Sequence, residues 1–537
     1  MQPKKQDWLL RRDFDRGGSG QVTVSRMGFM IIGCDETFAL AFFGQFFGLF
    51  VDTGYGTVLV FFVFIVCWYA TARRARRPDG PTPAWFIGNV LQIPSNNPEH
   101  KFTEWARTYG DVIYLKVFSQ SLIVLNSREA ARELLEQRGA MYSDRPRFVL
   151  FSEMMGWQNA STHVRYGARF RKHRRFMNQT FNQQAVADLQ PIQIKEALTL
   201  MEGLTATPEL FIDHIRRYAG ATILKIAYGA DVKSSDDLYI KLAERAATMT
   251  VRSGTPAATL VDYFPVMRYI PTWAPFSRFK RDALQVKAAV DQMMSLPYER
   301  VKEEMSMGTA ASSLTSRLIE AHLNTGSITH EDEEDIKGVA GTLYAAAEDT
   351  SVCVITSFIL AMVLYPEVFV KAQDEMDDVV GRARLPDLND REALPYLDAV
   401  IKEVYRWNPP VPLGIPHRVM GDDIYRDRFI PKGSTVLANA YAILKNCPDP
   451  DTFLPERFED PEVLNPRDVI FGFGRRKCPG RYFADAGVWL VLSMIISGFD
   501  ISKAKDSEGN VITPVAEFES AFVRHPKKFK CCIRPRK

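Results

Sequence analysis

A single cysteine, Cys478, lies in a glycine-rich and strongly basic turn directly before an apolar stretch. The turn reads FGFGRRKCPG over residues 471–480, and RYFADAGVWLVLSMII follows it. Gly474 and Gly480 permit tight turns and close backbone approach, and Pro479 suits the first turn of a helix. A helix start and the three basic residues before the cysteine would stabilise negative charge on the sulfur. The sequence therefore predicts a thiolate held where a loop meets a helix.

An isolated cysteine cannot complete a metal site alone, because zinc and iron–sulfur sites need several ligands at short spacing. Haem meets this condition, since the porphyrin supplies four nitrogens and the protein one axial ligand. A buried structural cysteine is the alternative that the residues leave open. The cysteines of the chain are scattered and odd in number, without a CxxC pair, which indicates a reducing compartment; they are Cys34, Cys67, Cys353, Cys447, Cys478, Cys531 and Cys532.

Composition limits the classes of function. The chain has 537 residues, of which 46% are hydrophobic, enough for a sizeable core. Its 67 basic and 64 acidic residues give a net charge of +3, too balanced for nucleic acid as the main partner. No repeat or low-complexity tract is present, which excludes a solenoid.

The N-terminal part predicts a membrane anchor. Residues 54–70 are uncharged and apolar, close to the roughly 20 residues that a helix needs to cross a bilayer. Four arginines follow within 71–77, so we expect the C-terminal part to face the cytoplasm. Residues 38–51 are too short to span and are expected to lie in the membrane interface. We therefore divide the chain into a polar extension (1–37) that need not function, a membrane-associated segment (38–77) and a domain (78–537).

The domain is expected to be mainly α-helical with a small β portion. Two apolar β-type runs, 112–118 and 121–126, predict a hairpin. Ser127 is placed to cap the helix that follows. Most of 167–406 has helical periodicity, without a repeated strand–helix unit. The pattern indicates one large domain.

Five positions of the basic turn match the haem-binding signature of the cytochrome P450 family: Phe471, Gly474, Arg476, Cys478 and Gly480. The chain resembles that family in motif order over 78–537. The resemblance implies the cytochrome P450 fold and a haem-thiolate monooxygenase in which Cys478 ligates the iron of haem b. It also implies that electrons come from NADPH through a reductase.

A second match concerns the stability of this fold rather than its chemistry. Glu403 and Arg406 in IKEVYRW share one face of a helix and can form an ion pair. They resemble the family's ExxR motif, and Arg457 in PERF resembles the third member of its structural network. The segment before it, 438–458, is shorter than usual and lacks the expected histidine, and Cys447 within it is not expected to be a ligand.

The catalytic residues are sought in GTLYAAAEDTSVCVITSFILAM, because polar residues inside an apolar helix need partners or a function. A local bend, with Thr350 bonded to the preceding turn, is one explanation. The segment also resembles the family's distal helix, which implies that Asp349 and Thr350 deliver protons while the O–O bond is cleaved. Ala347 and Ser351 depart from the family pattern of glycine and threonine.

The resemblance also implies cations for the two haem propionates. Arg174, Arg418 and Arg476 are the candidates, and Phe170 stands where the family usually has tryptophan. The eight histidines are dispersed and expected mostly at the surface. A basic cluster is expected to dock an acidic electron donor; it comprises Arg171, Lys172, Arg174, Arg175, Arg475 and Lys477.

Several segments look most like fungal secondary-metabolism members of the family, for example WNPPVPLGIPHRV. We expect a lipophilic substrate, a terpenoid first and a polyketide or indole compound as alternatives, and an enzyme anchored in the endoplasmic reticulum membrane. An isomerase or dehydratase that needs no reductase, and a haem-binding sensor, are the rival classes. The expected pocket segments are 143–167, 344–349, 411–416 and 518–523, with Glu517 and Glu519 as polar contacts.

Overall fold

The computed structural model describes residues 77–234, 236–254 and 259–536. The chain divides into two units, Met1–Arg76 and Arg77–Lys537. The polar extension and the membrane anchor that the sequence predicts lie outside the described residues, apart from Arg77. Among the described residues one helix, α13 (His330–Leu364), is apolar and long enough to cross a membrane, and 67% of its most apolar window is buried, as in a core helix.

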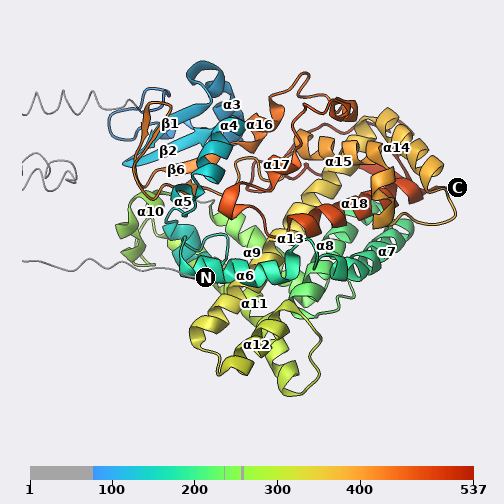
Figure 1. Cartoon of the computed structure of the whole chain (residues 1–537), viewed down its shortest axis with the longest axis horizontal. Helices are drawn as coiled ribbons and strands as arrows, with labels where there is room; N and C mark the ends of the chain where they lie inside the picture. Colours follow the sequence, from blue (N-terminus) through green and yellow to red (C-terminus); the bar gives the residue numbers. More distant parts are fainter. Residues whose placement is uncertain (1–76, 235, 255–258, 537) are drawn as a thin grey trace, which may run out of the picture. The chain divides into compact units, whose positions relative to one another are not determined.

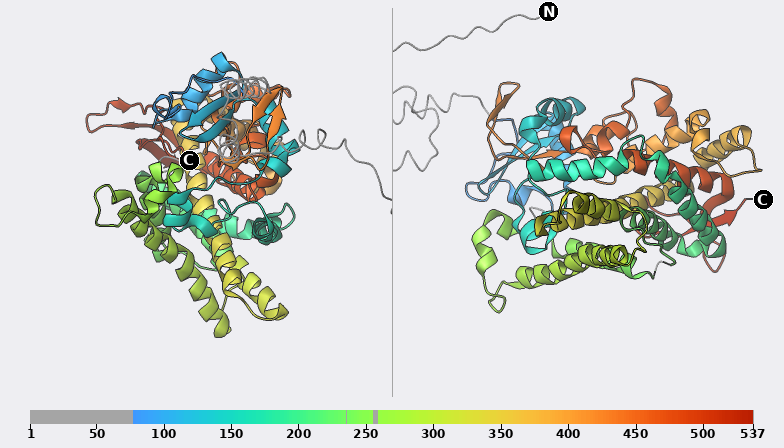
Figure 2. Two further views of the ribbon diagram at one scale, coloured as in Figure 1. Left: turned by 90° about the vertical axis from the view of Figure 1, so that its left-hand side faces the viewer. Right: turned by 60° about the horizontal axis from the view of Figure 1, so that its bottom comes forward.

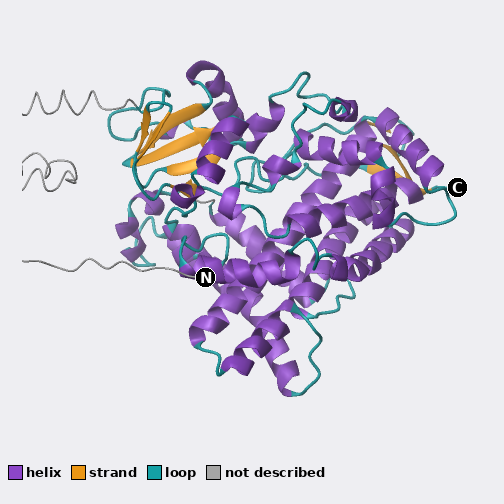
Figure 3. Ribbon diagram, viewed as in Figure 1, coloured by secondary structure: helices purple, strands orange, loops and turns teal. Residues whose placement is uncertain are grey.

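Helices form most of the second unit, which agrees with the expected fold class (Figures 1 and 3). The helices before α13 are α3 (Pro98–Tyr109), α4 (Arg128–Ala131), α5 (Gly139–Tyr142), α6 (Ala168–Phe181), α7 (Gln190–Ala206), α8 (Phe211–Tyr228), α9 (Leu238–Ser253), α10 (Leu260–Tyr263), α11 (Arg278–Ser306) and α12 (Leu314–Thr325). Those after it are α14 (Pro366–Val379), α15 (Pro395–Trp407), α16 (Ala440–Lys445), α17 (Arg467–Ile470) and α18 (Arg481–Gly498).

The predicted hairpin is confirmed and forms half of a mixed sheet. β1 (Val112–Val117) pairs antiparallel with β2 (Gln120–Leu125), and the strand order is β1-β2-β6-β3. β6 (Thr435–Ala438) runs parallel to β2, so segments far apart in the sequence lie side by side. The remaining strands are β3 (His417–Arg418), β4 (Asp423–Tyr425), β5 (Arg428–Ile430), β7 (Phe499–Lys505), β8 (Val511–Ile512) and β9 (Cys531–Pro535). The Ser127 cap is also confirmed, because its Oγ accepts from the Ala130 N–H at 3.1 Å.

The long helix α13 is the axis of the helical part. It begins with a capping box in which Thr329 and Asp332 satisfy each other's backbone N–H groups, and acidic residues fill its first turn, where the helix dipole favours them. Its C-terminal half is buried among α8, α15 and α18. The mixed sheet and the pair α11–α12 lie on opposite sides of α13 (Figures 1 and 2).

Glu403 joins α15 to the shortened segment around Cys447. Its carboxylate accepts from Arg406 Nε at 2.7 Å and Nη2 at 2.8 Å, and from Arg457 Nε at 3.2 Å. The same two guanidinium groups donate to backbone carbonyls of residues 448–452, and each has an Nη1 3.7 Å from the Cys447 sulfur. Since Glu403 and Arg406 are almost fully buried, removing one partner would leave an uncompensated charge.

Candidate active site

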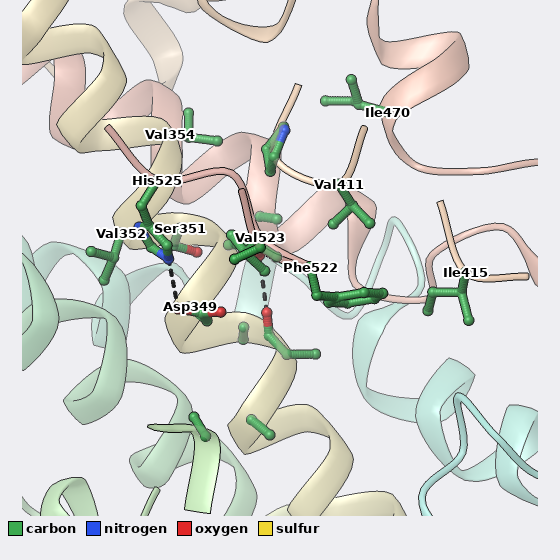
Figure 4. A pocket seen from close by; sticks show the side chains of 18 of the residues that line it. Asp349, Ser351, Val352, Val354, Val411, Ile415, Ile470, Phe522, Val523 and His525 are labelled. Atoms are coloured by element: carbon green, nitrogen blue, oxygen red, sulfur yellow. Dashed lines mark hydrogen bonds and ion pairs between the residues drawn. The ribbon is translucent and has the colours of Figure 1, made fainter. Parts of the chain in front are cut away.

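The described residues surround a cavity of about 1600 Å³ that lies between α13, the loop carrying Cys478 and the C-terminal loop 512–530. Figure 4 shows part of its wall, in which apolar side chains such as Val411, Ile415 and Phe522 lie to one side of the polar pair Asp349 and His525. All four predicted pocket segments contribute residues, and so do Glu517 and Glu519. The cavity is therefore mainly apolar, with charged groups at defined points.

Cys478 lies on the wall of this cavity at the end of a tightly folded loop. Its backbone N–H donates to the Phe471 carbonyl at 2.7 Å. Gly474 has a φ of +53°, and a Cβ there would collide with the carbonyl oxygen of Leu135, so a side chain is excluded on both grounds. Gly480 differs from the prediction, because its φ of −86° is ordinary and it serves as the N-cap of α18. Pro479 accordingly precedes the helix instead of lying in its first turn.

The charges around the sulfur also differ from the prediction. Burial raises the pKa of the Cys478 thiol, while the Gly480 N–H and the guanidinium groups of Arg174 and Arg481 lower it. Of the basic residues in the turn, Arg475 bonds to the Tyr166 hydroxyl. The compensating cations thus come from α6 and from the first residue of α18.

Arg476 is fixed with one of its donors unused. Nε donates to the Ser143 carbonyl and Nη2 to the Val164 carbonyl, both at 2.8 Å. The guanidinium carbon lies 3.7 Å from the centre of the Phe170 ring, so phenylalanine retains aromatic packing where tryptophan is usual. Nη1 is buried without a hydrogen-bond partner among the described residues. Burial lowers the pKa of Arg476 to about 10.

Two of the three cations predicted for the propionates line the cavity, Arg418 does not, and a further arginine does. Arg174 lines it and donates to the Lys477 carbonyl at 2.8 Å. Arg418 lies 3.5 Å from Asp144 in an ion pair and does not line the cavity. Arg145, which no motif identifies, lines it instead and donates to three backbone carbonyls at 2.7–2.8 Å.

The expectation of surface histidines is wrong for several of them. His417 and His163 line the cavity beside Arg145, and burial and then that arginine lower the pKa of each imidazole to about 3. His173 is fully buried, 3.0 Å from Asp335. These imidazoles face cations or complete a buried network.

The distal helix places both predicted proton donors on the cavity wall. Thr350 Oγ1 donates to the Ala346 carbonyl at 2.9 Å, so the local bond to the preceding turn is present and the residue still lines the cavity. Asp349 Oδ1 lies 2.8 Å from Nε2 of His525 (Figure 4). No sequence pattern indicates this partner, because it lies 176 residues away in an irregular loop.

Glu348, the neighbour of this pair, ionises at a higher pH than an ordinary glutamate. Burial and then the charge of Asp349 raise the pKa of Glu348 to about 7. It packs against α8, where its Cγ is 3.9 Å from the position that a Cβ of Gly220 would take. Glu348 is therefore partly protonated near pH 7.

The family model for Cytochrome P450 matches residues 78–533, which is most of the chain and includes every residue of the cavity described above. The chain is a member of the cytochrome P450 family. The curated relatives that it resembles include "Cytochrome P450 monooxygenase 136" of Postia placenta, 42% identical over 481 residues, which covers 88% of this chain and 91% of the relative.

Two further relatives come from other fungi. A cytochrome P450 monooxygenase of Hericium erinaceus named eriC is 41% identical over 474 residues, covering 86% of this chain and 92% of the relative. "Tryptamine 4-monooxygenase" of Psilocybe cyanescens is 38% identical over 496 residues, covering 89% and 97%. The protein is thus a cytochrome P450 monooxygenase of fungal secondary metabolism, an enzyme type that uses haem, a cysteine thiolate ligand and electrons from a reductase.

The residues of the cavity fit haem. The unused Nη1 donor of Arg476 is buried at the cavity and suits a carboxylate, which a haem propionate supplies. Arg174 and Arg145 add positive charge at the same cavity, and Cys478 lines it with a single sulfur. Asp144, which already pairs with Arg165, is the acid that interacts with Arg145 and Arg476, so the anionic groups of the cofactor would add charge compensation for these buried cations.

The ionisation of Glu348 predicts a pH-dependent change in stability. Its carboxyl ionises near pH 4.5 in the unfolded chain and near 7 in the folded one. Between these values the folded state binds more protons, so stability falls as pH rises, by about 3 kcal/mol in total. We expect Glu348→Gln to raise the thermal unfolding midpoint at pH 8 and to leave it unchanged at pH 4.5.

The matched control is Glu462→Gln, since Glu462 is exposed and should not change the midpoint at either pH. An equal effect of Glu348→Gln at both pH values would contradict a buried carboxyl with a raised pKa.

Proposed function

We propose that Cys478 is the axial ligand of the haem iron and that Arg174, Arg476 and Arg145 hold the propionates. Bound haem supplies the redox chemistry that activates dioxygen. The protein contributes the sulfur, whose negative charge Arg174, Arg481 and the Gly480 N–H favour. The observation that carries this assignment is the presence of Cys478 and the unpaired Arg476 donor at one cavity.

We assign proton delivery to the distal helix. Asp349 Oδ1 can pass a proton into the cavity, and the Thr350 hydroxyl, whose hydrogen bonds to Ala346, leaves its oxygen lone pairs for a water molecule. This acid–alcohol pair, together with relatives that are named monooxygenases, favours monooxygenation over an isomerase, a dehydratase or a haem-binding sensor.

The substrate that the cavity suits best is a lipophilic terpenoid. Aliphatic and aromatic side chains dominate its wall, from Val411 and Ile415 to Phe522 and Val523. An indole amine is the second candidate, because Glu519 also lines the cavity and would pair with an ammonium group, whereas Glu517 already pairs with Lys527. The name of the Psilocybe cyanescens relative supports this alternative.

Part of the predicted basic cluster is suitably placed to meet an acidic reductase. Arg171 and Arg175 on α6 and Arg475 in the cysteine loop are exposed. Arg174 lines the cavity, whereas Lys172 is 2.6 Å from Asp332 and 2.7 Å from Asp335. We propose that the exposed three contribute to docking of the electron donor.

An exposed apolar surface supports attachment to the endoplasmic reticulum membrane, with the domain on the cytoplasmic side. Two segments, 85–91 and 263–276, are joined through Phe118, whose ring lies 6.4 Å from Phe86 and 5.2 Å from Tyr263. Large exposed side chains on them are suited to insert into lipid headgroups; they are Trp85, Phe86, Leu91, Val266, Tyr269, Trp273 and Phe276.

The proposed reaction is tested with isotopically labelled dioxygen. The full chain, co-expressed with a fungal reductase, is given separate terpenoid, polyketide and indole-amine pools, and the products are analysed by mass spectrometry. We expect one labelled oxygen atom in products from the terpenoid pool. Label only in the indole-amine pool would select the second candidate, and product without label would contradict monooxygenation.

The membrane surface is tested by fluorescence quenching in vesicles with brominated acyl chains. Trp273 is 82% exposed, so we expect lipid bromine to quench it and Trp273→Phe to lose part of the quenching. Trp157→Phe is the control, because Trp157 is buried in the domain. Equal quenching in the protein with and without Trp273 would contradict insertion of this surface.

A further inference from the structure

We propose that His525 is a proton relay that carries protons from water to Asp349 during turnover. The inference rests on the proposed monooxygenase function and extends it to a residue of the C-terminal loop that no motif identifies. His525 Nε2 lies 2.8 Å from Asp349 Oδ1, and both residues line the cavity (Figure 4).

The exposure of the pair suits a relay. The side chain of His525 is 21% exposed, so water can reach the imidazole, and this histidine adds a fixed proton donor to Asp349, which is itself 41% exposed. The Nε2 atom bonds to the carboxylate, whereas no described residue forms a hydrogen bond with Nδ1. One ring nitrogen therefore faces the acid and the other remains available to water.

The loop holds the imidazole in place through its backbone. The Glu519 N–H donates to the His525 carbonyl at 2.7 Å, and the His525 N–H donates to the Val523 carbonyl at 3.1 Å. Phe518 and Pro526, the residues next to Glu519 and His525, pair with each other in a β-bridge. A donor fixed in this way is ready for transfer without a large rearrangement of the loop.

The chemistry of imidazole fits the task. The ring can accept a proton from water at Nδ1 and release the Nε2 proton to Asp349. The imidazole then carries its proton on Nδ1, and it regains the starting tautomer, with the proton on Nε2, before the next transfer. The overall reaction balances as substrate, O2, NADPH and one proton giving hydroxylated product, water and NADP⁺. Histidine exchanges protons near neutral pH, which lysine and arginine side chains ordinarily do not.

Other charged groups near His525 do not replace it. Glu348 on α13 interacts electrostatically with both members of the pair, whereas Arg216 on α8 and Glu244 on α9 interact with Glu348. Glu517 and Lys527 form their own ion pair at 2.7 Å, and Glu519 lines the cavity. Among the described residues, only the side chain of His525 forms a hydrogen bond to the Asp349 side chain.

The simpler alternative is a structural ion pair that ties the loop to α13. A test without substrate distinguishes the two, using the full haem-loaded chain with reductase and NADPH. Dioxygen then takes two electrons and two protons to give hydrogen peroxide, or four of each to give two waters. Slower delivery of protons favours release of peroxide.

We expect His525→Gln to raise the fraction of NADPH electrons recovered as peroxide about threefold or more. This is smaller than the usual effect on rate of losing an acid–base group. Glutamine can still donate to Asp349 but cannot relay a proton. His330→Gln is the matched control, because His330 is exposed at the start of α13, the helix that carries Asp349. Asp349→Asn should raise the peroxide fraction too, and the double variant should exceed neither single one.

A second readout does not depend on activity. Histidine ring carbons are labelled and observed by NMR in detergent, and the His525 signal is the one absent from His525→Gln. We expect Asp349→Asn to shift this signal at one fixed pH, because the Asp349 carboxylate is the hydrogen-bond partner of Nε2. An unchanged signal, an unchanged peroxide fraction or additive effects in the double variant would overturn the relay alone. If the unaltered enzyme consumed no NADPH, the proposed monooxygenase function would be contradicted, and the relay with it.

Discussion

Burial of a charged sulfur is the constraint on which the rest of the site depends. A thiol in an apolar interior resists ionisation, and burial does raise the pKa of Cys478. The fold opposes this with a backbone N–H and two arginines from different elements, α6 and α18. The loop can bring them together only because Gly474 allows its backbone to approach Leu135 closely. The loop backbone and the two arginines from distant elements therefore both affect the charge of the Cys478 sulfur.

The same interior contains cations that share one acid, because Asp144 interacts with Arg145 and Arg476 although Arg165 already pairs with it. Arg145 is buried and Arg476 has an unpaired donor, and both line the cavity. Burying these cations costs free energy when no cofactor is bound, and an anionic ligand offsets that cost when it binds. We expect haem binding to contribute strongly to the stability of the folded chain. By contrast, Glu403 and its two arginines are satisfied within the protein and hold α15 in place without the cofactor.

The features that the sequence predicted depend on local patterns. The hairpin of β1 and β2, the Ser127 cap and the pairing of Glu403 with Arg406 follow from alternation, capping chemistry and helical spacing. Residues that act through tertiary contacts were missed or misplaced. Arg418 is bound to Asp144 while Arg145 takes a place on the cavity wall, and the partner of Asp349 is distant in sequence. No periodicity encodes such contacts, because they arise when separate loops meet.

The most direct test of the account is the absorption spectrum of the reduced carbon monoxide complex of Cys478→Ser. The unaltered enzyme should show the red-shifted Soret band that thiolate ligation produces, and Cys478→Ser should lose that shift. Cys447→Ser is the control, since Cys447 lies beside Arg406 and Arg457 in the structural network and its replacement should leave the band in place. A red-shifted band retained in Cys478→Ser would contradict the assignment of the ligand and the site built around it.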